Sequence, residues 1–162
     1  MPTEIERKFL VTDASWRNAV ISRSSLTQAY LMRGDDRSVR IRIENGESAR
    51  LCVKVGASAL VRAEFEYPVP LADAREMVAL ATGIVIEKTR HRVHFQGYLW
   101  EIDAYHGVYE GLTVAEVELE SVDDHPPLPA WAGLEVTGDR RYSNANLSTA
   151  DLSGELRHGP SS

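Results

Sequence analysis

The chain has 162 residues, of which 43% are hydrophobic and 26% are charged, and these ordinary values exclude the disordered and fibrous classes. Its net charge of −6 lacks the basic surplus of nucleic-acid-binding proteins, although a local cluster of cations can still bind an anion. The single cysteine, Cys52, excludes an intrachain disulfide, and the charged N-terminus holds no apolar signal core. We therefore expect a cytoplasmic protein whose partners include neither nucleic acid nor membrane.

In chain order, the sequence is dominated by strand-like segments. Turn dipeptides at Asn45-Gly46 and Gln96-Gly97 indicate antiparallel hairpins. No linker or repeat divides the chain, so we expect a single domain over 1–158 and a disordered tail at 159–162. The predicted strands cover 3–11, 27–33, 38–45, 49–56, 61–69, 86–95, 98–106 and 113–121, with a weaker one near 134–138.

A few helices interrupt the strands. Asp13 can cap a helix over 14–21, because its carboxylate can accept amides of the first turn. An apolar stripe predicts a second helix over 71–82, ending before Gly83. The proline-rich stretch 125–132 is expected to be a loop with one helical turn, and a short helix is expected after residue 146.

The polar face of each predicted strand is almost wholly charged. Residues two apart share a face, so Glu4, Glu6 and Lys8 lie together, as do Arg40 and Arg42. A solvated face accounts for any single strand, but such faces usually mix in Thr, Ser and Gln. Across seven strands, the pattern favours charged faces that point into a barrel, with apolar faces outside beneath helices. We predict a mainly β fold with accessory helices (α+β), an eight-stranded antiparallel closed β-barrel with a charged lumen; an open sandwich is the alternative.

Such a lumen needs partners for its charges, because ionised groups that leave water must be paired. Carboxylates suit hard divalent cations such as Mg²⁺ or Mn²⁺, which bind partly through substrate phosphates. Arginine suits phosphate through its forked donors, and lysine serves as a point charge. The pattern therefore indicates a cavity that binds metal and phosphate. His91, His94 and His106 lack clustered ligand spacing and are expected to have surface or packing roles.

The N-terminal run Glu4-Ile5-Glu6-Arg7-Lys8 resembles the signature of the CYTH superfamily, the triphosphate tunnel metalloenzymes. The resemblance covers nearly the whole chain. It continues in order through Gln28-Ala29-Tyr30-Leu31, Arg40-Ile41-Arg42, Lys54, Arg62-Ala63-Glu64-Phe65-Glu66, Glu87-Lys88-Thr89-Arg90, Glu101-Ile102-Asp103, Glu116-Val117-Glu118 and Glu135 to Asn144.

The resemblance implies an eight-stranded antiparallel tunnel, one or two Mg²⁺ or Mn²⁺ ions and a role for each charged strand. Lys8, beside Tyr30, is a candidate base or a simple phosphate ligand, and Glu64 is a candidate helper in catalysis. The implied metal ligands are Glu4, Glu6, Glu116 and Glu118, with Asp103 in support. The implied triphosphate ligands are Lys8, Arg40, Arg42, Lys54, Lys88, Arg90 and Arg141, with Arg62 at a tunnel mouth.

The family likeness leads to a metal-dependent triphosphatase that releases phosphate from inorganic tripolyphosphate. Three alternatives stay open: a class IV adenylate cyclase, a thiamine or nucleoside triphosphatase, and a non-catalytic sensor that binds polyphosphate or a nucleotide. The oligomeric state, monomer or homodimer, is also left open.

Overall fold

The computed structural model describes residues 3–56, 61–81, 83–148, 154 and 156. No helix in these ranges is long and apolar enough to cross a membrane. The strands are β1 (Thr3–Val11), β2 (Val20–Arg33), β3 (Arg37–Glu44), β4 (Ser48–Gly56), β5 (Val61–Val69), β6 (Ile86–Phe95), β7 (Tyr98–Tyr105), β8 (Thr113–Glu118) and β9 (Ala132–Glu135). The helices are α1 (Leu71–Leu80), α2 (Asn144–Leu147) and the 3₁₀ turns Ser15–Ala19, Gly107–Tyr109 and Arg140–Tyr142.

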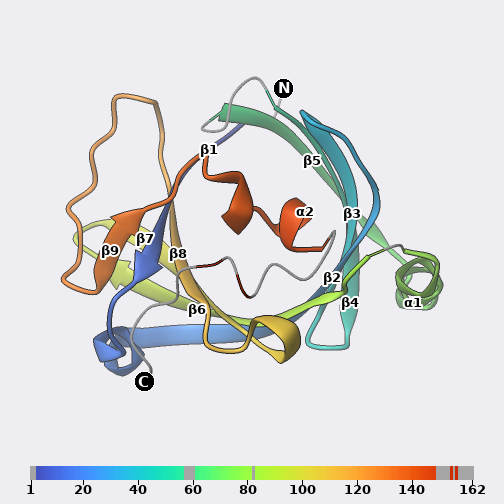
Figure 1. Cartoon of the computed structure of the whole chain (residues 1–162), viewed down its shortest axis with the longest axis horizontal. Coiled ribbons are helices and arrows are strands. Elements are labelled where there is room, and N and C mark those ends of the chain that lie inside the picture. Colours follow the sequence, from blue (N-terminus) through green and yellow to red (C-terminus); the bar gives the residue numbers. More distant parts are fainter. Residues whose placement is uncertain (1–2, 57–60, 82, 149–153, 155, 157–162) are drawn as a thin grey trace.

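The first eight strands close into an antiparallel barrel (Figure 1). Around the barrel the order is β1-β8-β7-β6-β2-β3-β4-β5, and β5 pairs back onto β1. This last pairing is short, from Thr3–Ala63 to Ile5–Val61, but it closes the ring and confirms the predicted eight-stranded closed barrel. The short strand β9 adds to β1 at Phe9 and Val11, outside the ring.

The greatest difference from the predicted elements is at 14–27. The helix expected over 14–21 is a single 3₁₀ turn, in which Asp13 accepts the amide and hydroxyl of Ser15. β2 starts at Val20 rather than at residue 27, because its polar first half pairs along β6 from Val20 to Gln28. Smaller shifts occur at β8, which ends at Glu118, and at β9, which precedes most of the predicted 134–138. The tail 159–162 lies outside the described residues.

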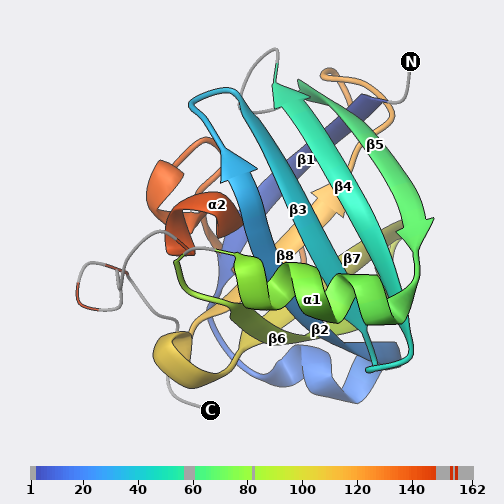
Figure 2. The same cartoon turned by 90° about the vertical axis from the view of Figure 1, so that its right-hand side faces the viewer.

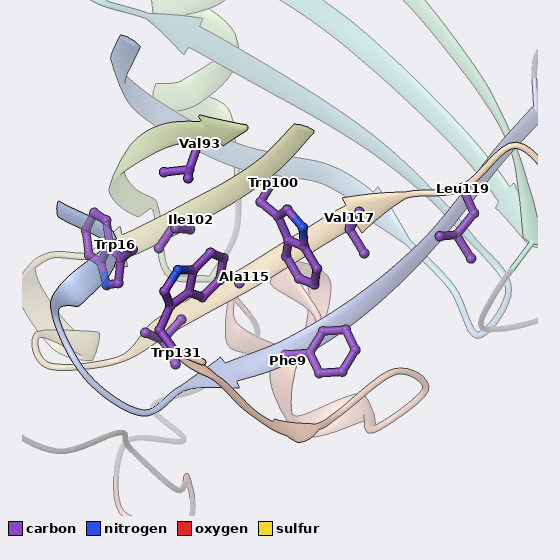
Figure 3. Packing of buried hydrophobic residues seen from close by; sticks show 10 residues of the cluster. Phe9, Trp16, Val93, Trp100, Ile102, Ala115, Val117, Leu119 and Trp131 are labelled. Carbon is purple, nitrogen blue, oxygen red and sulfur yellow. The ribbon is translucent and has the colours of Figure 1, made fainter. Parts of the chain in front are cut away.

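The apolar strand faces lie on the outside of the barrel, as predicted. Helix α1 covers β2, β3 and β4, where Ala74 packs against Ile41, Ile43 and Ala49 (Figure 2). On the other side of the barrel, aromatic side chains cover the outer faces of the strands. Trp16 from the first 3₁₀ turn and Trp131 from the loop before β9 lie over the strands in a cluster that also contains Phe9, Trp100, Ile102 and Val117 (Figure 3).

One end of the barrel interior is apolar. The strand faces that carry charges in their middle carry Leu10, Ile86 and Val114 at this end. These side chains pack against Tyr142 and Leu147, which belong to the segment that follows β9 and lies inside the ring of strands in Figure 1. The predicted tunnel is therefore a cavity, filled at one end by apolar side chains and lined elsewhere by charged ones.

Candidate functional site

The charged strand faces enclose a cavity of about 470 Å³ inside the barrel. Of the residues predicted for the site, all but Lys88, Asp103 and Arg141 line it. The sequence reasoning did not assign Ser143 and Asn144, which also line the cavity. They belong to the segment that fills the barrel end, and strand periodicity gives no signal for a segment that enters from outside the sheet.

An acidic wall forms where β1 meets β8 and β5. The strand register places Glu6 opposite Glu118 and Glu4 opposite Arg62. Two carboxylates at directly opposite positions repel each other. Burial, together with the charges of Glu116 and Glu4, raises the pKa of Glu6 to about 8. Burial also raises the pKa of Glu4 and of Glu118, so the cations around this wall do not fully offset the cost of ionising its carboxylates.

Glu116 lies in the same wall but remains ionised. Its carboxylate is 3.7 Å from Nζ of Lys8 and 4.0 Å from Nη2 of Arg90. Burial opposes the negative charge, but Lys8 and Arg90 outweigh it and lower the pKa of Glu116 to about 2. Lys8 also donates to the carbonyl of Tyr142 at 3.3 Å, so it connects Glu116 to the segment that fills the barrel end.

Asp103 is enclosed by two cations on β6. Nζ of Lys88 donates to Oδ2 at 2.6 Å, and Arg90 donates through Nε and Nη2 at 2.8 and 2.9 Å. The carboxylate is 1% exposed, and although burial opposes its charge, Arg90 and Lys88 hold its pKa well below the ordinary value. Burial lowers the pKa of Lys88 to about 7, and the ion pair with Asp103 only partly offsets it. Both oxygens of Asp103 are thus occupied, and Lys88 lies behind the cavity wall.

The opposite wall is a cluster of guanidinium groups. Arg40 is 4% exposed and donates to Gln28 at 3.3 Å, yet its Nε and that of Arg42 have no hydrogen-bond partner among the described residues. Burial, then the positive charges of Arg40 and Arg90, lowers the pKa of Arg42 to about 10. Buried donors without acceptors are rare in folded proteins, and here they face a cavity together with repelling like charges. An anion in the cavity would satisfy both deficits.

Of the remaining predicted site residues, Tyr30, Glu64 and Lys54 line the cavity, whereas Arg141 does not. Tyr30 is buried and lines the cavity opposite Arg40 in the register. Glu64 lies 3.6 Å from Lys54, which also contacts Glu4 at 3.2 Å. Arg141 is directed elsewhere, since its guanidinium is nearly half exposed and pairs with Asp139 at 2.7 Å.

A second group of ligand-type side chains lies on β4 and β5. Cys52, Glu64 and Glu66 can each bring one ligand atom within 4.8 Å of the others. Burial raises the pKa of the Cys52 thiol, which disfavours the thiolate that binds metals. Hard divalent cations prefer oxygen ligands, so the all-carboxylate wall suits them better than this mixed group.

Comparisons with known proteins agree with this geometry. The chain matches the CYTH domain family over residues 2–149. It is 39% identical over 149 residues to an inorganic triphosphatase of Acetivibrio thermocellus, which covers 91% of this chain and 94% of that protein. An inorganic triphosphatase of Nitrosomonas europaea is 32% identical, with 90% and 97% covered. A crystal structure of an inorganic triphosphatase superposes with a TM-score of 0.66 at 31% identity, covering 91% and 95% of the two chains.

The sequence match spans nearly the whole chain, and the fold is similar to that of a solved inorganic triphosphatase. This chain belongs to the CYTH domain family.

Proposed function

We propose that this chain hydrolyses the terminal phosphoanhydride bond of inorganic tripolyphosphate with the help of a divalent metal ion, releasing phosphate. The observation that carries the proposal is the division of one cavity into a carboxylate wall and a wall of guanidinium groups with unpartnered donors. A cation and a polyanion together would neutralise both walls. Two relatives that cover most of the chain bear the name inorganic triphosphatase.

The family implies a divalent metal, and the carboxylate wall fits one. Glu4, Glu6, Glu116 and Glu118 supply the oxygen ligands that Mg²⁺ and Mn²⁺ prefer, and the excess negative charge around Glu6 calls for a cation. When bound, such an ion would neutralise phosphate oxygens and position water. Asp103, whose oxygens already bind Lys88 and Arg90, is assigned to holding these two cations in place.

Phosphoryl transfer needs mainly positioning and charge neutralisation from a protein. We assign Arg40, Arg42 and Arg90 to the phosphate oxygens, with Lys8 and Lys54 as point charges at the acidic wall. Arg40 and Arg90 are buried and the other three are half-buried, which limits competing water and strengthens each contact with the substrate. Tyr30, beside Arg40, and Glu64, beside Lys54, are positioned to orient these cations.

The cavity favours an inorganic substrate over a nucleotide or thiamine triphosphate. A second hollow of about 390 Å³ adjoins the first and shares Glu6, Lys8, Lys54 and Arg62 with it. Apart from Tyr30, no aromatic ring lines either hollow within the described residues. An adenine or thiazolium ring would require a stacking surface or an apolar pocket, and the lining offers charged and small polar groups instead.

The experiment compares three substrates. Purified protein is incubated with tripolyphosphate, ATP or thiamine triphosphate in Mg²⁺ or Mn²⁺, and phosphate, pyrophosphate and cyclic AMP are measured. We expect phosphate and pyrophosphate in equal amounts from tripolyphosphate, at a rate well above that for the other two. Glu110→Gln, an exposed position away from the cavity, serves as a matched control for Glu116→Gln. Cyclic AMP from ATP without phosphate release, or tight binding without turnover, would contradict the proposal.

A further inference from the structure

Arg62 forms a bridge between two carboxylates of the acidic wall. Its Nη2 donates to Oε1 of Glu4 at 2.8 Å and to Oε1 of Glu6 at 2.8 Å. The register of β1 with β5 places Arg62 directly opposite Glu4, whereas Glu6 faces Glu118. A single nitrogen therefore neutralises the two β1 carboxylates that the proposed metal site also uses.

Arg62 is held less firmly in this bridge than Arg90 is held by Asp103. Arg90 donates hydrogen bonds to both oxygens of Asp103, through Nε and Nη2, and its side chain is 9% exposed. Arg62 contacts both carboxylates through Nη2 alone, its side chain is 29% exposed, and its Nε has no hydrogen-bond partner in the described part of the chain. Loss of the fork geometry removes much of the specificity of an arginine–carboxylate pair, so this guanidinium can be displaced.

A divalent ion and the Arg62 guanidinium compete for the same oxygens. Mg²⁺ binds carboxylate oxygens at about 2.0–2.1 Å, so it would lie within a few ångströms of a guanidinium nitrogen that contacts those atoms. Two cations at that separation repel strongly, because the carboxylates that they would share are only 15% exposed and solvent screens them little. Arg62 also lines both the charged cavity and the adjoining hollow, so a rotation away from Glu4 and Glu6 keeps it beside an incoming anion.

We propose that Arg62 is a resident counter-ion which the metal displaces, and that the released guanidinium then binds the triphosphate. One side chain thereby couples the two ligands, because each ligand favours the Arg62 position that the other requires. This inference rests on the proposed function, since it takes Glu4 and Glu6 as metal ligands. It gives Arg62 opposite effects on metal and on anion, which a purely structural residue would not have.

The first test measures Mn²⁺ binding by titration calorimetry, in the absence of any triphosphate. We expect Arg62→Gln to bind Mn²⁺ about 5-fold or more tightly than the wild type, the lower bound of typical coupling between sites. Arg62→Lys retains a competing charge and should stay near the wild type. Arg7→Gln is the matched control, since Arg7 lies on β1 next to Glu6 but pairs with Glu135 and does not line the cavity. Unchanged or weaker Mn²⁺ binding in Arg62→Gln would overturn the inference.

The second test measures binding of an imido-bridged, non-hydrolysable tripolyphosphate analogue. In EDTA, Arg62 is held by Glu4 and Glu6, so Arg62→Gln should change the affinity by less than about 2-fold. With Mn²⁺ present, the same substitution should weaken binding by about 10-fold or more, as expected for loss of a charge-assisted hydrogen bond. Equal losses in both conditions would show that Arg62 contacts the anion without a metal-dependent exchange.

A third measurement guards against a misfolded variant. Without metal, Arg62→Gln should melt at a lower temperature than the wild type, because Glu6 loses its contact with Arg62 and Glu4 is left with Lys54. Mn²⁺ should raise the melting temperature of the variant by more than that of the wild type. The two proposals fail separately. Absence of phosphate release with tightened Mn²⁺ binding would remove the triphosphatase assignment alone, whereas hydrolysis with weakened Mn²⁺ binding in Arg62→Gln would remove this inference alone.

Discussion

Substitution of Asp103 by Asn tests how the buried charges stabilise the barrel. The change removes one negative charge and retains the shape of the side chain. Asp103 now accepts three hydrogen bonds, from Lys88 at 2.6 Å and from Arg90 at 2.8 and 2.9 Å, and it is 1% exposed. Removal of one partner of a buried ion pair costs about 3–5 kcal/mol, because the other charge is left uncompensated.

The structure places the expected cost at the lower end of that range. Arg90 keeps Glu101 at 3.6 Å and Glu116 at 4.0 Å as partners. Burial lowers the pKa of Lys88 to about 7 even with Asp103 present, and loss of Asp103 lowers it further, so this amine is not left as an uncompensated charge at pH 8. We therefore expect Asp103→Asn to lower the free energy of unfolding by about 3 kcal/mol at pH 8.

Urea denaturation followed by circular dichroism measures this effect. With a slope of about 2 kcal/mol per molar urea, the midpoint should fall by about 1.5 M. Glu101→Gln is the control, since Glu101 is partly exposed and lies 3.6 to 3.8 Å from its cations, so its loss should cost less than about 1 kcal/mol. Equal midpoints for the two variants would refute the reasoning. Mn²⁺ affinity should survive Asp103→Asn but fall in Glu116→Gln, and an equal fall would make Asp103 a metal ligand.

Three further predictions follow from the same structure. Glu118→Gln should reduce phosphate release by at least about 100-fold, and full activity would remove Glu118 from the metal site. The metal-free variant should keep or gain resistance to urea, because burial, Glu4 and Glu101 raise the pKa of Glu118 and disfavour its charged form. Burial lowers the pKa of His91, whose ring packs on Trp16. The charges of Arg17 and Arg23 lower this pKa further, whereas the Ile102 carbonyl and Asp103 oppose the shift. The unfolded chain therefore takes up this proton first, so stability should fall as pH drops below 6.5, and His91→Phe should flatten that part of a urea-midpoint profile between pH 7 and 5; identical profiles would contradict this. Trp131→Ala should cost about 3–5 kcal/mol in the same assay, because the ring is 6% exposed and packs edge-on against Trp100 at 5.3 Å; a loss below about 1 kcal/mol would show that the loop before β9 does not cover the barrel.

Most strands could be predicted because their two faces differ so sharply. Alternation along Glu4, Glu6 and Lys8 marks one face of β1, and the structure places these residues on the cavity wall. The first half of β2 was missed because Ser22 to Ser25 is polar on both faces and carries no period of two. That segment is a strand because β6 supplies its hydrogen-bond partners, which local pattern does not reveal. The roles of the individual site residues remain predictions.

By itself, the sequence determined which side chains share a face and that charge and apolar surface lie on opposite sides of the strands, since a strand's geometry is local. Only the tertiary structure decided which charges meet. Arg62 contacts Glu4 and Glu6, which are more than fifty residues away in the sequence, and Lys88 forms a buried ion pair with Asp103. Neither contact can be read from local sequence, because register and closure depend on pairing between strands. The apolar end of the cavity was likewise decided by where Tyr142 and Leu147 return to the barrel. The burial that shifts the pKa of Glu6 and Glu116 exists only once the ring of strands is complete.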